Sequence, residues 1–197
     1  MTQALTYLKE TPSQTAGPYV HIGLTPNALG LAGVYRADLG ATMLTPALKG
    51  ERIRIEGRIF DGANSPIRDG LVEIWQADAE GRYGANADSL TGWGRSATDL
   101  DSGRFHFNTI KPGRVSMPDG RMQAPHINLW IVARGVNLGL HTRLYFPDEV
   151  DANAADPLLA KLEHQSRVAT LIARCEGAAL IFDIRLQGEN ETVFLDI

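Results

Sequence analysis

Alternation of apolar and polar residues dominates the chain from residue 52 onward. Apolar side chains take every second position in four segments, and charged or amide side chains lie between them. The apolar sets are Ile53, Ile55 and Ile59; Phe105 and Phe107; Ile127, Leu129 and Ile131; and Leu180, Phe182, Ile184 and Leu186. Because successive side chains of a strand point to opposite faces, this pattern predicts half-buried β-strands.

Turn-forming residues separate these segments. They are Asp-Gly at 61–62, 69–70 and 119–120, Asp-Ser-Gly at 101–103, and Pro-Gly at 112–113. Short strands with frequent turns favour an antiparallel β-sandwich or barrel. The run at 71–77 predicts one more strand, which buries either Trp75 or the pair Val72 and Ile74.

The segment that starts at Asp156 breaks the alternation. Asp156 and Pro157 are typical of an N-cap and the first residue of a helix. Apolar residues then follow at roughly helical spacing as far as Cys175. The spacing predicts one helix, or two short ones with a break near Ser166.

Residues 1–50 are rich in Gly, Pro and Thr and lack either period. They predict a mostly irregular arm that lies over a surface. Without a linker or an internal repeat, we expect one domain over 1–197, with the arm at 1–50 and a β-sandwich core at 51–197.

Composition narrows the possible partners and the compartment. The chain has 197 residues, 44% of them hydrophobic, and a net charge of −4. No Lys/Arg-rich run suggests nucleic acid or an anionic membrane, and neither a signal peptide nor an apolar span is expected. Cys175 is the only cysteine, which predicts a reducing cytoplasm and a small buried side chain near a helix end.

Several motifs share one order along residues 50–190. They are Glu-Gly-Arg-Ile at 56–59, Leu-Val-Glu-Ile-Trp-Gln-Ala at 71–77, Gly-Arg-Tyr at 81–83, Gly-Arg-Ser-Ala-Thr-Asp at 94–99, Thr-Ile-Lys-Pro-Gly at 109–113, Ala-Pro-His-Ile-Asn at 124–128 and Leu-Tyr-Phe at 144–146. In this order and spacing the chain resembles the intradiol ring-cleaving dioxygenases. The resemblance implies a β-sandwich and an enzyme that opens a catechol ring with dioxygen.

The resemblance also implies where iron would be held. Family members bind a ferric ion with two tyrosines and two histidines, a set that suits a hard cation. Tyr83 and His126 match the first of each pair, whereas Val115 and Asn128 stand at the other two positions. The resemblance therefore implies a degenerate site without bound metal, in which Tyr83 packs at a loop and His126 is an ordinary strand histidine.

The N-terminal arm resembles one branch of the family. Thr-Pro-Ser-Gln-Thr-Ala-Gly-Pro-Tyr-Val at 11–20 is similar to the start of the α chain of two-chain members, in which α and β chains of one fold pair around one iron. The resemblance implies that Thr15, Gly17, Pro18, Tyr19 and Arg134 line the substrate pocket at the iron of a β chain. A plain turn in the arm, and a salt bridge or solvent contact for Arg134, are the alternatives.

Three functional hypotheses therefore stand. The first is an α chain that lacks its own catalytic set and joins an iron-bearing β chain in a hetero-oligomer of several α–β pairs. The second is a self-sufficient intradiol dioxygenase with altered ligands at Val115 and Asn128. The third is a non-enzymatic β-sandwich binding module.

Overall fold

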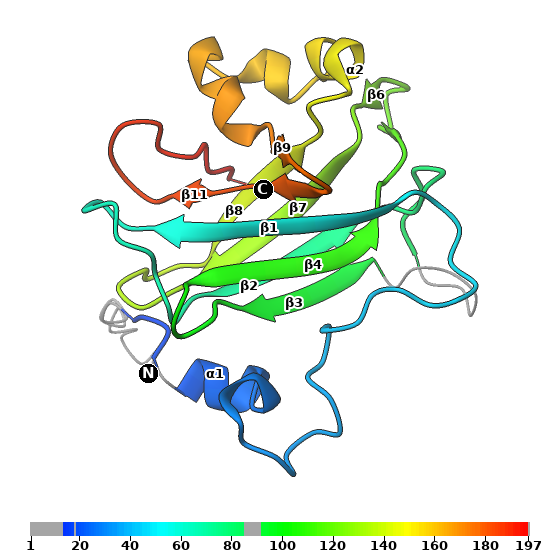
Figure 1. The fold of residues 1–197 in the computed structure, drawn as a ribbon. Coiled ribbons are helices and arrows are strands. Elements are labelled where there is room, and N and C mark those ends of the chain that lie inside the picture. The colour runs from blue at the N-terminus through cyan, green and yellow to red at the C-terminus, as the bar shows by residue number, and fades with distance from the viewer. Residues whose placement is uncertain (1–13, 18, 85–91, 197) are drawn as a thin grey trace, which may run out of the picture.

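Two sheets stacked face to face form most of the protein (Figure 1). The computed structural model describes residues 14–17, 19–84 and 92–196. One sheet contains β1 (Arg52–Phe60), β4 (Arg104–Ile110), β9 (Arg174–Glu176), β10 (Ala179–Ile181) and β11 (Ile184–Arg185). The other has the strand order β3 (Trp93–Ala97), β2 (Leu71–Gln76), β7 (His126–Val132) and β8 (Leu140–Tyr145). A separate two-stranded sheet joins β5 (Val115–Ser116) and β6 (Met122–Gln123).

The core lies between these two sheets. Ile55 and Phe105 of the first sheet belong to one buried cluster with Val72, Ile74 and Leu129 of the second. The predicted mainly-β fold is therefore confirmed. Strand β2 buries Val72 and Ile74 and turns Trp75 outward, which decides between the two faces left open by the sequence.

Not every strand pair is antiparallel, contrary to expectation. β1 runs antiparallel to β4 but parallel to β10 and β11. The predicted strand over 180–186 is split in two around Phe182 and Asp183, because the Asp183 carboxylate accepts the Arg58 backbone N–H at 3.1 Å. A side chain thus takes the place of one ladder acceptor and interrupts the strand.

The helical segment is shorter and more broken than predicted. It contains α2 (Val150–Ala154), which precedes Asp156, and two 3-10 helices, η2 (Leu159–Lys161) and η3 (Gln165–Leu171). Asp156 does act as a cap, since its Oδ1 accepts the N–H of Leu158 at 2.9 Å. The break between η2 and η3 falls at residues 162–164, close to Ser166 as predicted.

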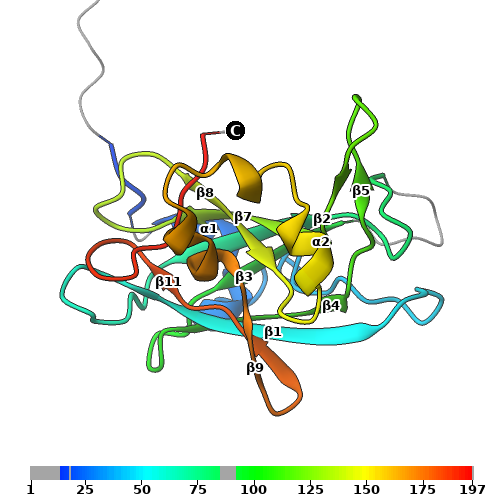
Figure 2. The same cartoon turned by 90° about the horizontal axis from the view of Figure 1, so that it is seen from above.

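The prediction for Cys175 is wrong. Its side chain is exposed and lies on β9, whose ribbon projects from the sheet edge in Figure 2. The chain leaves its helical course before that point, because the Ala173 N–H bonds the Tyr145 carbonyl of β8 at 2.9 Å.

The described part of the arm is mostly irregular, as expected, with two short helices. It forms α1 (Tyr19–Leu24) and η1 (Asn27–Leu29), which lie beside the β3 edge in Figure 1. The buried His21 ring anchors α1, with its Nε2 3.0 Å from the Gly70 carbonyl. The arm is therefore attached to the sandwich by specific polar contacts.

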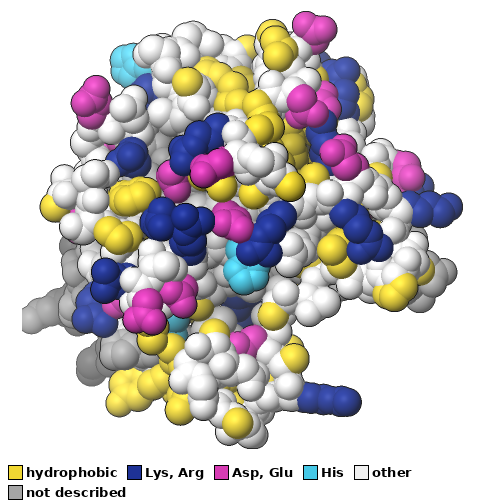
Figure 3. Space-filling model, in the orientation of Figure 1, with side chains coloured by type: hydrophobic (Ala, Val, Ile, Leu, Met, Phe, Trp, Pro, Cys, Tyr) yellow, Lys and Arg dark blue, Asp and Glu magenta, His cyan; other side chains and the backbone are white. Residues whose placement is uncertain are grey.

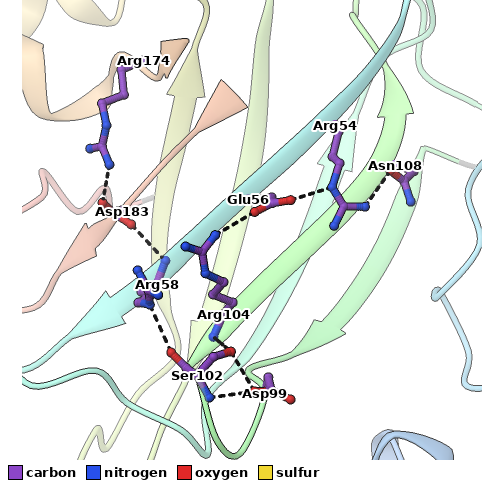
Figure 4. Close-up of polar contacts among 9 residues, drawn as sticks. All are labelled: Arg54, Glu56, Arg58, Asp99, Ser102, Arg104, Asn108, Arg174 and Asp183. Atoms are coloured by element: carbon purple, nitrogen blue, oxygen red, sulfur yellow. Dashed lines mark hydrogen bonds and ion pairs between the residues drawn. The ribbon is translucent and has the colours of Figure 1, made fainter. Parts of the chain in front are cut away.

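A band of charged side chains crosses the outer face of β1 and β4 (Figure 3). Glu56 is 2.6 Å from Arg54 and 2.9 Å from Arg104, and Arg174 is 3.0 Å from Asp183 (Figure 4). The Arg54 hydrogen bond is the main cause that lowers the pKa of Glu56. These contacts fit a water-facing sheet surface whose charges are largely paired.

Candidate functional site

The outer face of the second sheet is hollowed where β2, β7 and β8 meet. Trp75, Asn128 and Arg143 are neighbours across these three strands. They line a hollow of about 430 Å³ together with Trp93, Trp130 and His141. Aromatic walls with a few polar groups are typical of a small-molecule pocket.

Tyr83 reaches this region from the loop after β2. Gly81 has a φ of +78°, and an added Cβ there would lie 1.8 Å from the Arg114 carbonyl oxygen, so glycine lets the loop pack against the segment before Val115. The Tyr83 ring stacks on Trp75 with centroids 6.0 Å apart. Its hydroxyl accepts a hydrogen bond from Asn128 Nδ2 at 3.3 Å, and its burial is the main cause that raises its pKa.

Val115 and His126 complete the surroundings. Val115 is buried in β5, pairs with Gln123 and offers no donor atom. His126 is also buried, and its Nδ1 lies 2.8 Å from the Ala124 carbonyl. Burial, assisted by the nearby Arg143 charge, lowers the pKa of His126 to about 4, so the ring is neutral at pH 7.

Asn128 is held in a hydrogen-bond network. Its Nδ2 donates to the Trp75 carbonyl at 3.2 Å, and its Oδ1 accepts from Arg143 Nε at 2.8 Å. A second Arg143 nitrogen donates to Gln123 Oε1 at 2.7 Å. A permanently charged guanidinium thus lies against the amide.

The four positions do not fit a ferric ion. Val115 has no ligand atom, the Asn128 amide oxygen is engaged by Arg143, and an amide is a poor ligand for a hard trivalent ion. Within the described ranges no three His, Cys, Asp or Glu side chains group as a metal site would require. We refer to Tyr83, Val115, His126 and Asn128 as the degenerate site.

The arm residues gather elsewhere, near the end of β7. The Thr15 hydroxyl accepts the Gly135 N–H at 2.7 Å, and Arg134 pairs with Asp69 at 2.7 Å. Gly17 and Tyr19 follow Thr15 in the chain, and Tyr19 is exposed, whereas Pro18 lies outside the described residues. The structure therefore brings Thr15 and Arg134 into one surface region.

The degenerate site and the Thr15–Arg134 region lie at different positions along β7. Asn128 is inside β7, and Arg134 follows its end. At about 3.3 Å per residue, the strand from Asn128 to its end at Val132 carries the chain roughly 13 Å away before the turn that holds Arg134. Arg134 therefore lies beyond the end of the strand, away from the degenerate site of its own chain.

Sequence reasoning missed Arg143, Gln123 and Trp130. Arg143 is the direct partner of Asn128 across β7 and β8. Its polar position between apolar Leu140 and Leu144 was the available signal, but the pairing register was needed to place it.

A β-sandwich that carries this ordered but incomplete site defines a ring-cleaving dioxygenase scaffold. The family model described as Dioxygenase matches residues 36–188. This chain belongs to that family, the intradiol dioxygenases, whose members use iron.

Individual relatives agree with this assignment. The chain is 47% identical to a protocatechuate 3,4-dioxygenase alpha chain of Pseudomonas putida, over 96% of this chain and 97% of that protein. It is 36% identical to a protocatechuate 3,4-dioxygenase beta chain of Burkholderia cepacia, over 73% of this chain and 67% of that protein. The solved dioxygenase domain of a carbohydrate-binding fusion from Streptomyces sp. SirexAA-E superimposes with a TM-score of 0.54 at 26% identity, covering 78% of this chain and 88% of that one. In the part of the chain that the structure describes, no helix is long and apolar enough to cross a membrane.

Proposed function

We propose that this chain is the α subunit of a protocatechuate 3,4-dioxygenase. The enzyme would cleave protocatechuate with dioxygen between the two hydroxylated carbons and give 3-carboxy-cis,cis-muconate. Similarity to an alpha chain over nearly the full length supports the subunit type. The observation that carries the proposal is the degenerate site, whose Asn128 amide is bonded to Arg143.

In this proposal the ferric ion belongs to a homologous β chain. The β chain supplies the iron ligands and the redox chemistry, while this chain supplies pocket wall and assembly surface. The 36% identity to a beta chain supports the existence of such a partner. Several such α–β pairs would associate. We place the enzyme in the cytoplasm, because the single cysteine of this chain fits a reducing compartment.

The arm and the end of β7 would form this chain's share of the pocket. Protocatechuate carries a carboxylate beside its catechol, and Arg134 offers a cation whose side chain is 64% exposed. Thr15 fixes the arm beside it through the Gly135 N–H. Gly17, Pro18 and Tyr19 would complete the wall, with the arm packed on the partner.

The two alternatives are weaker. A self-sufficient enzyme would need two further ligands, and Val115 and Asn128 provide neither. A non-enzymatic binding module would not explain nearly full-length identity of 47% to a dioxygenase chain.

Iron analysis tests the proposal. The full chain would be purified alone and after co-expression with a chain that carries the complete two-tyrosine, two-histidine set. We expect no stoichiometric iron and no visible tyrosinate–iron absorption in the chain alone, and both in the complex. A coloured ferric species in the chain alone would favour the self-sufficient enzyme.

A further inference from the structure

Arg143 bonds one position of the degenerate site and the ladder partner of another. It lies opposite Asn128 in the β7–β8 pair and donates from Nε to Asn128 Oδ1 at 2.8 Å. It also donates to Gln123 Oε1 at 2.7 Å, and Gln123 is the ladder partner of Val115. One guanidinium thus bonds Asn128 directly and reaches the Val115 position through Gln123, the two positions at which the family's ligands are missing.

Short hydrogen bonds hold the Arg143 and Asn128 side chains in fixed positions. Arg143 is partly buried, and its two bonds have the short lengths of charge-assisted hydrogen bonds. The planar guanidinium presents donors in a fixed fork, which sets the direction of both acceptors. The Asn128 amide is fixed as well, because its nitrogen faces the Trp75 carbonyl and the Tyr83 hydroxyl.

We propose that Arg143 is a built-in cation that takes the place of a metal ion at the degenerate site and keeps metal cations out. The proposal rests on the proposed function only in treating these four positions as those of a former iron site. Guanidinium stays charged at any physiological pH. A fixed positive charge in contact with a ligand position opposes a metal cation by on the order of 100-fold or more in affinity.

Restoring the missing ligands tests this proposal. Two versions of the full chain would be co-expressed with the iron-bearing partner: V115Y/N128H, and V115Y/N128H with Arg143→Gln. Glutamine keeps a hydrogen-bonding amide but removes the charge. We expect only the complex that lacks Arg143 to hold one extra iron per α–β pair, with added tyrosinate–iron absorption. Iron in the unsubstituted complex tests the proposed function separately.

Arg121 provides the matched control. It is a half-exposed arginine on the neighbouring β5–β6 turn, paired with Asp119 at 2.7 Å. V115Y/N128H with Arg121→Gln should stay free of extra iron. The proposal is overturned if V115Y/N128H binds extra iron while Arg143 is present, or if removing Arg143 yields none in a folded complex.

A second pair of variants with fewer substitutions tests the proposal if the triple variant does not fold. Asn128→His alone places a second imidazole two residues from His126 on β7, and Asn128→His/Arg143→Gln does the same without the charge. Nickel(II) affinity of the two complexes would be measured by isothermal titration calorimetry. Binding at least about tenfold tighter without Arg143 supports the proposal, and equal affinities overturn it.

Discussion

Substitution of Arg134 by alanine should selectively weaken the capture of protocatechuate. Arg134 is 64% exposed and 2.7 Å from Asp69, so the free chain should lose no more than about 1 kcal/mol of stability. In the complex, a partly solvated contact between guanidinium and the substrate carboxylate is worth roughly 1–3 kcal/mol. The loss in kcat/KM for protocatechuate should therefore be about 5- to 150-fold.

Steady-state oxygen uptake on two substrates checks this. Plain catechol lacks the carboxylate, so Arg134→Ala should reduce its kcat/KM far less, and the visible iron spectrum should stay unchanged. Asp69→Asn is the matched control, because it breaks the same ion pair but leaves the guanidinium. It should leave protocatechuate capture equal or improved. Equal losses for both substrates, or the same loss from Asp69→Asn, would show that Arg134 serves fold or assembly.

Three further predictions concern stability and the arm. Because burial holds the pKa of His126 near 4 against an ordinary 6.5, unfolding takes up a proton between these values, and stability should fall by up to about 3 kcal/mol as pH drops from 6.5 to 4. Urea unfolding at pH 7 and pH 4.5 checks this, because His126→Gln should reduce the difference in unfolding free energy between the two pH values. The same difference in variant and parent would contradict it. Asp156→Ala removes the acceptor of the Ala124 N–H and a cap, so thermal unfolding should show a loss of about 2–4 kcal/mol; a loss below about 0.5 kcal/mol would refute the network. Thr15→Val removes the acceptor of the Gly135 N–H, so limited proteolysis should cut the arm faster than in the parent complex, and equal rates would argue against that anchor.

The sandwich was predictable because the alternation of apolar and polar side chains marks which face of each strand is buried. Ile55, Phe105 and Leu129 alternate with polar residues, and all three lie in the core. Strand direction was not predictable, because alternation is the same in parallel and antiparallel pairs; β1 uses both. Roughly helical spacing up to Cys175 also could not show that the backbone forms 3-10 turns and then a strand.

The site was predictable only where motifs carry it. Tyr83 and Asn128 come from segments that the sequence motifs mark, and the structure joins them by a hydrogen bond. Arg143 and Gln123 belong to no motif, and only strand register places them against Asn128 and Val115. These contacts across strands could therefore be identified only from the strand pairing in the structure.

In the proposed function, this chain completes an active site whose iron is held by another chain. Oxygen uptake with protocatechuate, measured on this chain alone, on the iron-bearing chain alone and on the co-expressed complex, tests it most directly. We expect no uptake by this chain alone, full uptake with ring-cleaved product by the complex, and a much lower kcat/KM for the iron-bearing chain without its partner. Turnover by this chain alone, or full activity of the iron-bearing chain without it, would contradict the proposed function.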